Sequence, residues 1–378
     1  MTGQNNIHIP LVDLGAQYRS IKNEIDAAIA NVIARSAYVG GTFVEQFERE
    51  FAAAVGAKHC IGVGNGTDAL LITLKALGVG AGDEVIVPAN TFIATAEVVS
   101  ALGAHVVFVD VREDDFCLDV DLVRKKITKK TKVIIPVHLY GMPASMDQLL
   151  ALAREHGILI LEDTAQAHLA TYNKRTVGTL GVAGTFSFYP GKNLGAYGDA
   201  GAIVTNDGEL ATKCRMFANH GRAKDEKYDH QIEGCNSRLD GLQAAVLSVK
   251  LKHLPEWTKK RRAVAKKYTE LLRDVPELVP PKTFAERESA YHLYVVRAKE
   301  RDALRMHLKE EGIEAGVHYP IGLPYLNAYR HLELNKPDDF PVTYRLQSEI
   351  LSLPIYAELS DPDLLRITDT IKNFYRVS

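Results

Sequence analysis

The sequence predicts an α/β protein with two lobes: a large lobe built on a mainly parallel sheet, then a smaller α+β lobe. Three observations lead to this fold class. Short apolar runs alternate with helical patterns from residue 58 to residue 204, which is typical of a parallel sheet covered by helices. This alternation stops after Asp207. The chain has 378 residues, enough for more than one lobe. We therefore expect a division into residues 1–254, which include an N-terminal arm, and residues 255–378.

The expected elements of the large lobe follow from the spacing of the apolar residues. Residues 21–34 and 43–57 have apolar side chains at helical spacing, and a turn at Gly40-Gly41 separates them. Short apolar runs predict buried strands at 58–63, 84–87, 104–109, 131–137, 157–161, 183–188 and 200–204. Helical patterns fill the gaps between the first five strands, at 67–77, 91–101, 119–126 and 145–155.

The pattern after Asp207 predicts a different arrangement. A polar loop at 223–236 is too long for a simple connector. Pro255 should end or bend an amphipathic helix that precedes it, because proline lacks the N–H that a helix needs. The elements expected here are helices at 209–222, 237–254 and 257–272, a proline-rich linker at 275–284, and a strand at 291–298.

Composition excludes several classes of function. Lysine and arginine number 45 and aspartate and glutamate 47, so the net charge is −2 with no block of one sign. This balance argues against binding to nucleic acid or to a membrane surface. The N-terminus has no secretory pattern and no run is apolar enough for a membrane span, so we expect a cytoplasmic protein. The four cysteines lack C-x-x-C spacing, which favours free thiols and no metal site.

An acid and a lysine each follow an apolar run in the middle of the chain. The run ILILE leads to Asp163, and FSFYPG leads to Lys192. In parallel sheets the ligand crevice lies beyond the carboxyl ends of the strands, so both side chains should face it. Pyridoxal 5′-phosphate suits such a pair, because a lysine holds it as a Schiff base and an acid pairs with its pyridinium nitrogen.

The cofactor would also need a phosphate site, for which residues 62–77 are the candidate. The segment GVGNGTDALL is a glycine-rich turn that leads directly into a helical pattern. Backbone N–H groups at a helix start bind phosphate without a formal cation. Thr67 is expected to cap this helix and to offer its hydroxyl as well.

A collinear set of motifs resembles one protein family, the DegT/DnrJ/EryC1/StrS nucleotide-sugar aminotransferases. The motifs are IPLVDLGAQY (9–18), YVGG (38–41), NGTDAL (65–70), PANTFIATA (88–96), HLYG (138–141), LEDTAQAH (161–168), FSFYPGKNLGA (186–196), NSRLDGLQAA (236–245) and HYP (318–320). The resemblance covers nearly the whole chain and implies the aspartate aminotransferase fold (fold type I). It implies that Lys192 carries the cofactor and moves the proton, and that Asp163 keeps the pyridine nitrogen protonated.

The resemblance also assigns the rest of the site. Gln166 would touch the phenolic oxygen or the face of the cofactor ring, and Phe92 would stack on its other face. The phosphate would be held by Gly66, Thr67 and Ser187. Asn236 would reach the phosphate of a second subunit, which implies a homodimer with shared active sites. The residues on the substrate side would be Tyr38, His318 and Tyr319.

Each of these residues also has a purely structural interpretation. Asp163 could simply cap a helix, and Phe92 could be an ordinary core aromatic on an apolar helix. His138 and His168 could be functional or could be hydrogen-bonded polar groups at strand ends.

Other functions fit the sequence less well. The glycines before Gly66 suggest a dinucleotide-binding loop, but G-x-G-x-x-G requires glycine where Thr67 stands. Some relatives of the family are sugar dehydratases with histidine at the position of Lys192. Regulators with this fold carry an added DNA-binding helix pair, for which we expect no spare segment. A binding-only protein would keep the phosphate site but would not react with an amino donor.

We therefore expect an aminotransferase that takes its amino group from L-glutamate and gives it to a nucleotide-linked keto sugar. The form of the lysine loop, with Tyr189 where C4-specific members more often have histidine, resembles the branch acting on 3-oxo sugars. A dTDP-linked 3-oxo-6-deoxyhexose is the expected substrate. The alternatives are UDP-linked 3-oxo-N-acetylglucosamine and a 4-oxo sugar.

Overall fold

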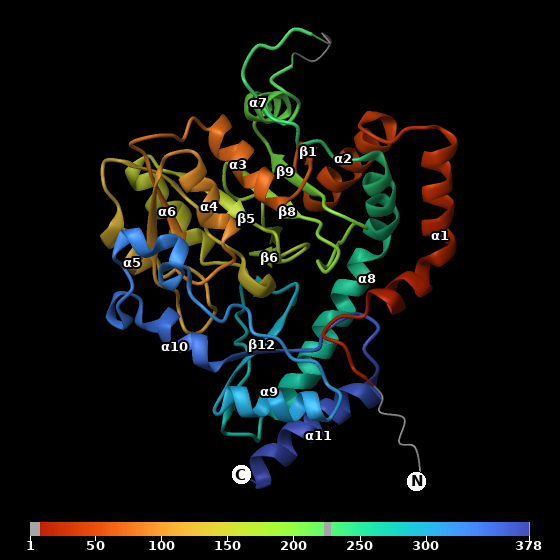
Figure 1. The fold of residues 1–378 in the computed structure, drawn as a ribbon, viewed down its shortest axis with the longest axis vertical. Helices are drawn as coiled ribbons and strands as arrows, with labels where there is room; N and C mark the ends of the chain where they lie inside the picture. Colours follow the sequence, from red (N-terminus) through yellow and green to blue (C-terminus); the bar gives the residue numbers. More distant parts are fainter. Residues whose placement is uncertain (1–7, 223–227, 378) are drawn as a thin grey trace.

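The computed structural model describes residues 8–222 and 228–377 (Figure 1). Its centre is a seven-stranded sheet with the strand order β1-β9-β8-β5-β4-β2-β3. The strands are β1 (His59–Val63), β2 (Glu84–Pro88), β3 (His105–Val109), β4 (Thr131–Ile134), β5 (Leu159–Asp163), β8 (Ala183–Ser187) and β9 (Gly201–Thr205). Only β9 runs antiparallel to its neighbours. The predicted mainly parallel sheet is thus confirmed.

One predicted strand of this sheet is shorter than expected. The run 131–137 was expected to be one strand, but β4 ends at Ile134. Pro136 has no N–H to give to the ladder, so pairing becomes irregular from that point. The Asp163 N–H still donates to the Pro136 carbonyl at 2.9 Å.

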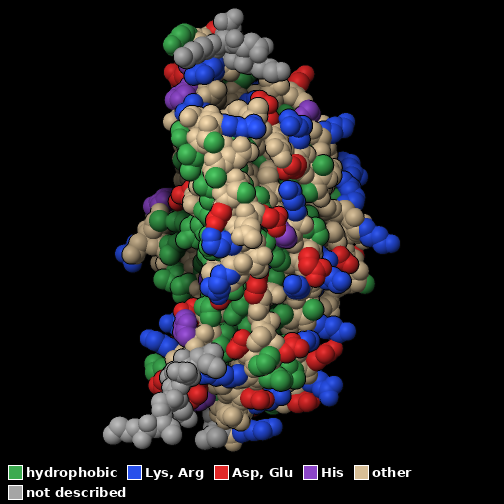
Figure 2. Space-filling view, turned by 90° about the vertical axis from the view of Figure 1, so that its right-hand side faces the viewer, with side chains coloured by type: hydrophobic (Ala, Val, Ile, Leu, Met, Phe, Trp, Pro, Cys, Tyr) green, Lys and Arg blue, Asp and Glu red, His purple; other side chains and the backbone are tan. Residues whose placement is uncertain are grey.

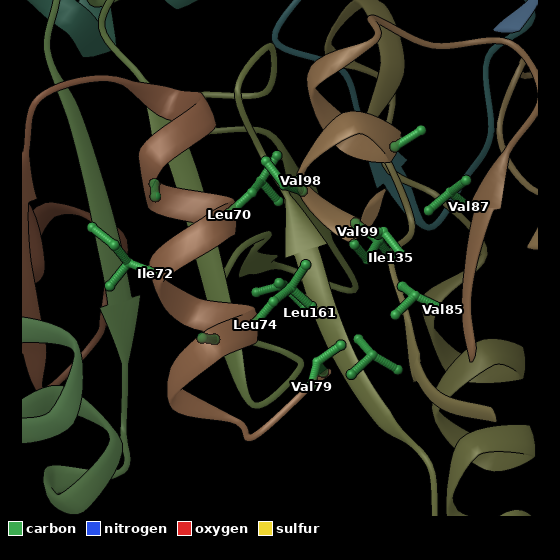
Figure 3. Packing of buried hydrophobic residues seen from close by; sticks show 14 of the residues in the cluster. Leu70, Ile72, Leu74, Val79, Val85, Val87, Val98, Val99, Ile135 and Leu161 are labelled. Atoms are coloured by element: carbon green, nitrogen blue, oxygen red, sulfur yellow. The ribbon is translucent and has the colours of Figure 1, made fainter. Parts of the chain in front are cut away.

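Helices cover both faces of the sheet. They are α2 (Gly41–Val55), α3 (Gly66–Ala76), α4 (Ala94–Ala101), α5 (Val120–Lys126), α6 (Met146–His156) and α7 (Gly208–Ala218). Side chains alternate along each strand, so Val85 and Leu161 pack against α3, α4 and α7, while Ile86 and Ile160 pack against α5 and α6. Figure 3 shows the first of these layers around Leu74.

Helix α8 (Gly241–Leu272) connects the two lobes and corrects two predictions. It begins at Gly241 and not at residue 237, and it continues through Pro255, so the end that the sequence allowed there is wrong and the helix expected at 257–272 is its second half. Burial on both sides of the proline explains this continuity. Leu254 packs with the large lobe and Val264 with the small lobe. The division predicted after residue 254 therefore falls inside one helix.

The small lobe is built on an antiparallel sheet, β10-β12-β13. Its elements are β10 (Leu278–Val279), β12 (Tyr294–Ala298), β13 (Ile350–Leu353), α9 (Arg301–Glu310), α10 (Pro341–Glu349) and α11 (Asp361–Val377). The proline-rich segment 275–284 was predicted as a linker, but it contains β10. The N-terminal arm joins this lobe, because Ile9 pairs with Ile313.

The remaining elements are one long helix, α1, and several elements of two to six residues. Helix α1 (Leu14–Ala34) packs on α8 through Ile21 and Ile25. A third small sheet joins the two lobes. The short elements are β6 (Thr171–Tyr172), β7 (Arg175–Thr176), β11 (Arg287–Glu288), η1 (Leu139–Gly141), η2 (Leu323–Tyr325), η3 (Asn327–Leu332) and η4 (Pro337–Asp339).

The surface and the helices agree with the balanced composition. Figure 2 shows acidic and basic side chains interspersed over the face that it presents. Within residues 8–222 and 228–377, no helix combines the length and the apolar character needed to cross a bilayer.

Candidate active site

A cavity of about 790 Å³ lies at the carboxyl ends of the parallel strands. Asp163, the last residue of β5, and Ser187, the last residue of β8, both line it. The first turn of α3 forms another part of its wall, and residues from the small lobe complete it. The cavity is therefore in the crevice that the order of strands and helices predicted.

Lys192 reaches this cavity from the loop that follows β8. The loop is a tight turn in which the Lys192 N–H donates to the Tyr189 carbonyl at 2.8 Å. Gly195 allows the turn, because a Cβ at that position would lie 2.2 Å from the Pro190 carbonyl oxygen. Burial lowers the pKa of Lys192 to about 8, although the negative charge of Asp163 acts to raise it. A lysine with such a pKa can serve as a nucleophile and as a proton carrier.

Asp163 is 5% exposed and only partly hydrogen-bonded. It accepts from the Thr95 hydroxyl at 2.8 Å and from the Ala165 N–H at 3.2 Å. Burial raises the pKa of Asp163, and these two hydrogen bonds oppose that change. A carboxylate has about four acceptor positions, so Asp163 can still accept a hydrogen bond from a cationic N–H in the cavity. The interpretation of Asp163 as a mere helix cap is wrong, because no helix begins there.

The start of α3 forms the candidate phosphate site. Gly66, Thr67 and Ser187 meet there, and a Cβ at Gly66 would lie 2.7 Å from the Ser187 Cβ. The glycine therefore leaves a cradle of backbone N–H groups and hydroxyls that fits a phosphate group. The predicted cap needs correction: the helix begins one residue earlier, and Asn65 caps it by accepting from the Asp68 N–H at 2.8 Å. This leaves the Thr67 hydroxyl available to a ligand.

Gln166 and Phe92 occupy two further parts of the wall. The Gln166 carbonyl accepts from the Tyr140 N–H at 2.7 Å, and its amide donates to the Tyr319 hydroxyl at 3.1 Å. Phe92 lies before α4, not inside it, and is 51% exposed. The alternative that Phe92 is a core residue is therefore wrong.

The HYP segment contributes from the small lobe. His318 and Tyr319 both line the cavity. The ring of Tyr319 lies 5.8 Å from the ring of Phe92, centroid to centroid. His318 Nδ1 and the Ser352 hydroxyl are 2.8 Å apart, and burial together with Lys192 lowers the pKa of His318. These residues stay predictions for the substrate side.

Two predicted residues lie outside the cavity of their own chain. Tyr38 and Asn236 are both exposed, and neither belongs to the cavity wall as the described residues form it. Their segments are neighbours, since Val39 pairs with Asp240. Any role in the site would require these residues to act on a second copy of the chain.

Of the two histidines with open interpretations, His138 is structural by its contacts, whereas the role of His168 stays open. The Ala144 N–H donates to His138 Nδ1 at 3.0 Å, so the other ring nitrogen, Nε2, carries the hydrogen and donates to Glu162 at 3.0 Å. His168 packs beside Phe186 and Phe188, and burial lowers its pKa to about 3. Neither of its buried ring nitrogens has a hydrogen-bond partner among the described residues, so it is not the hydrogen-bonded group that the sequence offered as one alternative. Neither ring lines the cavity.

Sequence reasoning missed several residues of the wall, among them Arg261 and His292. Arg261 lies in a run of basic residues, where most charges are solvated, and His292 begins the segment leading into β12. No sequence signal distinguishes the arginine from its neighbours. Among the described residues, no group of three or more His, Cys, Asp or Glu could hold a metal ion.

Comparisons with known proteins agree with this geometry. The model of the DegT/DnrJ/EryC1/StrS aminotransferase family matches residues 19–372. The dTDP-3-amino-3,4,6-trideoxy-alpha-D-glucose transaminase of Streptomyces venezuelae is 45% identical over 97% of this chain and 96% of its own. The UDP-N-acetyl-3-dehydro-alpha-D-glucosamine 3-aminotransferase of Acidithiobacillus ferrooxidans is 40% identical over 97% and 98%. The crystal structure of S. venezuelae DesV with a ketimine intermediate has a TM-score of 0.94 at 45% identity, over 97% of this chain and 98% of that chain.

Proposed function

The chain belongs to the DegT/DnrJ/EryC1/StrS aminotransferase family, and on this premise we propose that it aminates the C3 ketone of a nucleotide-linked 3-oxo hexose. It is a sugar aminotransferase that depends on pyridoxal 5′-phosphate. The proposed amino donor is L-glutamate. The proposed acceptor is a dTDP-linked 3-oxo-6-deoxyhexose, because the more similar of the two transaminases compared above is named for a dTDP-linked 3-amino sugar.

The observation that carries this proposal is the meeting of three groups in one cavity. A lysine with a lowered pKa, a partly hydrogen-bonded buried acid and a helix start with a glycine cradle all line it. When bound, pyridoxal 5′-phosphate supplies an aldehyde that exchanges the amino group and a ring that takes up electrons.

The side chains would divide the work of the site. Gly66, Thr67 and Ser187 would hold the phosphate through N–H and O–H donors. Asp163 would hold a proton on the ring nitrogen, an electrostatic effect that is organised before the reaction begins. Lys192 would carry a proton between the donor carbon and the cofactor.

A second copy of the chain completes the proposed site. Tyr38, Val39 and Tyr197 are exposed aromatic or apolar side chains near the start of α8. Asn236 lies next to this surface, and we propose that it reaches the phosphate site of the partner subunit. Analytical ultracentrifugation tests this arrangement: a monomer at micromolar concentration would contradict it.

The experiment for the substrate runs the reaction backwards. Purified holoenzyme is supplied with 2-oxoglutarate and one of three amino sugars: a dTDP-linked 3-amino-6-deoxyhexose, a UDP-linked 3-amino-N-acetylglucosamine or a dTDP-linked 4-amino sugar. We expect glutamate formation with the dTDP-linked 3-amino sugar. Equal activity on the 4-amino sugar would refute the C3 assignment. A preference for the UDP sugar would support the alternative substrate, a UDP-linked 3-oxo sugar. The A. ferrooxidans relative is named for a sugar of this kind.

A further inference from the structure

Arg261 is a buried arginine in the cavity wall, and only one of its nitrogens hydrogen-bonds to the described residues. Its side chain extends from α8 between the lobes and is 6% exposed. Nη1 donates to the carbonyls of Tyr291, His292 and Ile355, at 3.1, 3.3 and 3.0 Å. These contacts fix the guanidinium in one orientation.

The other edge of this guanidinium has no partner. Within the part of the chain that the structure describes, no acceptor lies within hydrogen-bonding distance of Nε or Nη2, and no carboxylate forms an ion pair with Arg261. Burial lowers the pKa of Arg261 to about 10, so it remains a cation at neutral pH. The charge of Glu358 partly opposes this change, but among the described residues Glu358 neither hydrogen-bonds nor ion-pairs with Arg261. The buried donors of the Nε–Nη2 edge therefore lack acceptors, which is unfavourable, and this suggests that an anionic ligand supplies them.

A short series of contacts connects Arg261 to the reactive lysine. His292, whose carbonyl accepts from Arg261, lies with its Nδ1 3.2 Å from the Asn193 side-chain oxygen. Asn193 directly follows Lys192, and its amide donates to the Ala290 carbonyl at 2.9 Å. Arg261 and Lys192 line the same cavity. The candidate phosphate site at α3 is made from other segments, so Arg261 is not required there.

We propose that the Nε–Nη2 edge of Arg261 binds the α-carboxylate of the amino donor. The proposal rests on the aminotransferase function above and adds the group that recognises the donor. A guanidinium edge matches a carboxylate through two parallel hydrogen bonds. In an amino acid the reacting nitrogen and the α-carboxylate share one carbon, so the carboxylate site must lie near the reacting lysine. The diphosphate of a nucleotide sugar is separated from the reacting C3 by part of the sugar ring.

The test compares three donors in the donor half-reaction. Holoenzyme is mixed with L-glutamate, with L-glutamine, which keeps the α-carboxylate, or with L-isoglutamine, in which the α-carboxylate is an amide. The loss of the visible absorbance of the lysine-bound cofactor is followed. The parent should react at least about 100-fold less efficiently with isoglutamine than with glutamine, because a buried donor pair would lose its acceptor. Arg261→Lys should weaken glutamate use about 100-fold and reduce this discrimination to less than about fivefold.

Arg301→Lys is the matched control. Arg301 is also buried in the small lobe and also donates to carbonyls, those of Ile350 and Gln347, but it does not line the cavity. It should leave the discrimination between the donors unchanged. The acceptor half-reaction, measured from the amine form of the Arg261→Lys enzyme with keto sugar, should change less than about threefold.

Three outcomes would overturn the proposal. An equal loss in both half-reactions would assign Arg261 to packing, and a loss confined to the keto sugar would assign it to the diphosphate. Full discrimination against isoglutamine in Arg261→Lys would also refute it. Maleate, an unreactive dicarboxylate, separates this inference from the proposed function. If the parent transaminates no donor but binds maleate in an Arg261-dependent manner in calorimetry, the function fails while the carboxylate site stands.

Discussion

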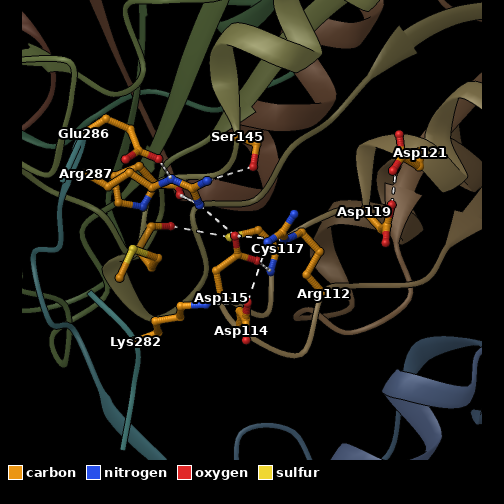
Figure 4. Close-up of polar contacts among 12 residues, drawn as sticks. Arg112, Asp114, Asp115, Cys117, Asp119, Asp121, Ser145, Lys282, Glu286 and Arg287 are labelled. Atoms are coloured by element: carbon orange, nitrogen blue, oxygen red, sulfur yellow. Dashed lines mark hydrogen bonds and ion pairs between the residues drawn. The ribbon is translucent and has the colours of Figure 1, made fainter. Parts of the chain in front are cut away.

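Two buried polar regions of this protein differ in one respect, the completeness of their hydrogen bonding. Near β11, Arg287 uses all of its nitrogens: Nη1 donates to Asp115 at 2.7 Å, Nη2 to the Ser145 hydroxyl at 2.9 Å and Nε to Glu286 at 3.1 Å (Figure 4). In the cavity wall, Arg261 uses Nη1 alone toward the residues that the structure describes. The first arginine joins segments of the chain, and the second is available to a ligand.

The same contrast separates two consecutive acids of β5. Glu162 accepts from the N–H groups of Gly178, Leu180 and Gly181, each at 2.7 Å, and interacts with His138 at 3.0 Å. Among the described residues, Asp163 accepts from Thr95 and Ala165 alone. Consecutive strand residues point to opposite faces, so one acid supports the scaffold and the other faces the cavity. Burial alone does not identify a functional group; incomplete hydrogen bonding of a buried group that also lines the cavity is the more informative sign.

Lys192→Ala should separate activity from stability most strongly. Turnover should fall by at least about four orders of magnitude, because the nucleophile and proton carrier are lost. The unfolding temperature should stay equal or rise, because a partly desolvated ammonium is removed from the fold. Steady-state assays and circular dichroism melting measure the two effects. A large drop in melting temperature would place Lys192 with the scaffold groups instead.

Asp163→Asn tests the acid that faces the cavity. Turnover should fall about a thousandfold, because an amide cannot stabilise a proton on the ring nitrogen through charge. The protein should still fold and bind cofactor through the phosphate site. The kcat of reconstituted variant and parent gives the answer. A variant within tenfold of the parent would show that Asp163 has no part in the chemistry.

Glu162→Gln tests the acid on the other face. Its amide group would direct N–H donors at the N–H groups of residues 178–181, so the free energy of unfolding should fall by about 3 kcal/mol. The kcat per folded molecule should change less than about threefold. Urea unfolding and active-site titration measure these quantities. A stable but inactive variant would show that Glu162, like Asp163, acts in the reaction and does not mainly support the fold.

Most of the fold follows from the sequence pattern, and so do some of the residues that line the cavity. Apolar alternation identified all seven strands of the large sheet, and Asp163 and Lys192 were found because they follow two of those strands. Arg261 was not found, because what distinguishes it from other basic helix residues is contact with carbonyls 30, 31 and 94 positions away. The continuity of α8 through Pro255 also depends on packing against both lobes, which no local pattern contains.

The pH dependence of cofactor attachment sharpens the comparison for Lys192 itself. Burial lowers the pKa of Lys192 to about 8 from an ordinary 10.5. Only the neutral amine attacks an aldehyde. The rate at which cofactor-free protein binds added pyridoxal 5′-phosphate covalently should therefore fall about tenfold for each pH unit below 8 and level off above it. Stopped-flow absorbance measures this rate, with Nα-acetyl-lysine as the solvated reference amine. If the rate inflects at the same pH for the protein and for the reference amine, the cavity does not desolvate Lys192. The incomplete hydrogen bonding of the groups in the cavity would then have no effect on the reactivity of this lysine.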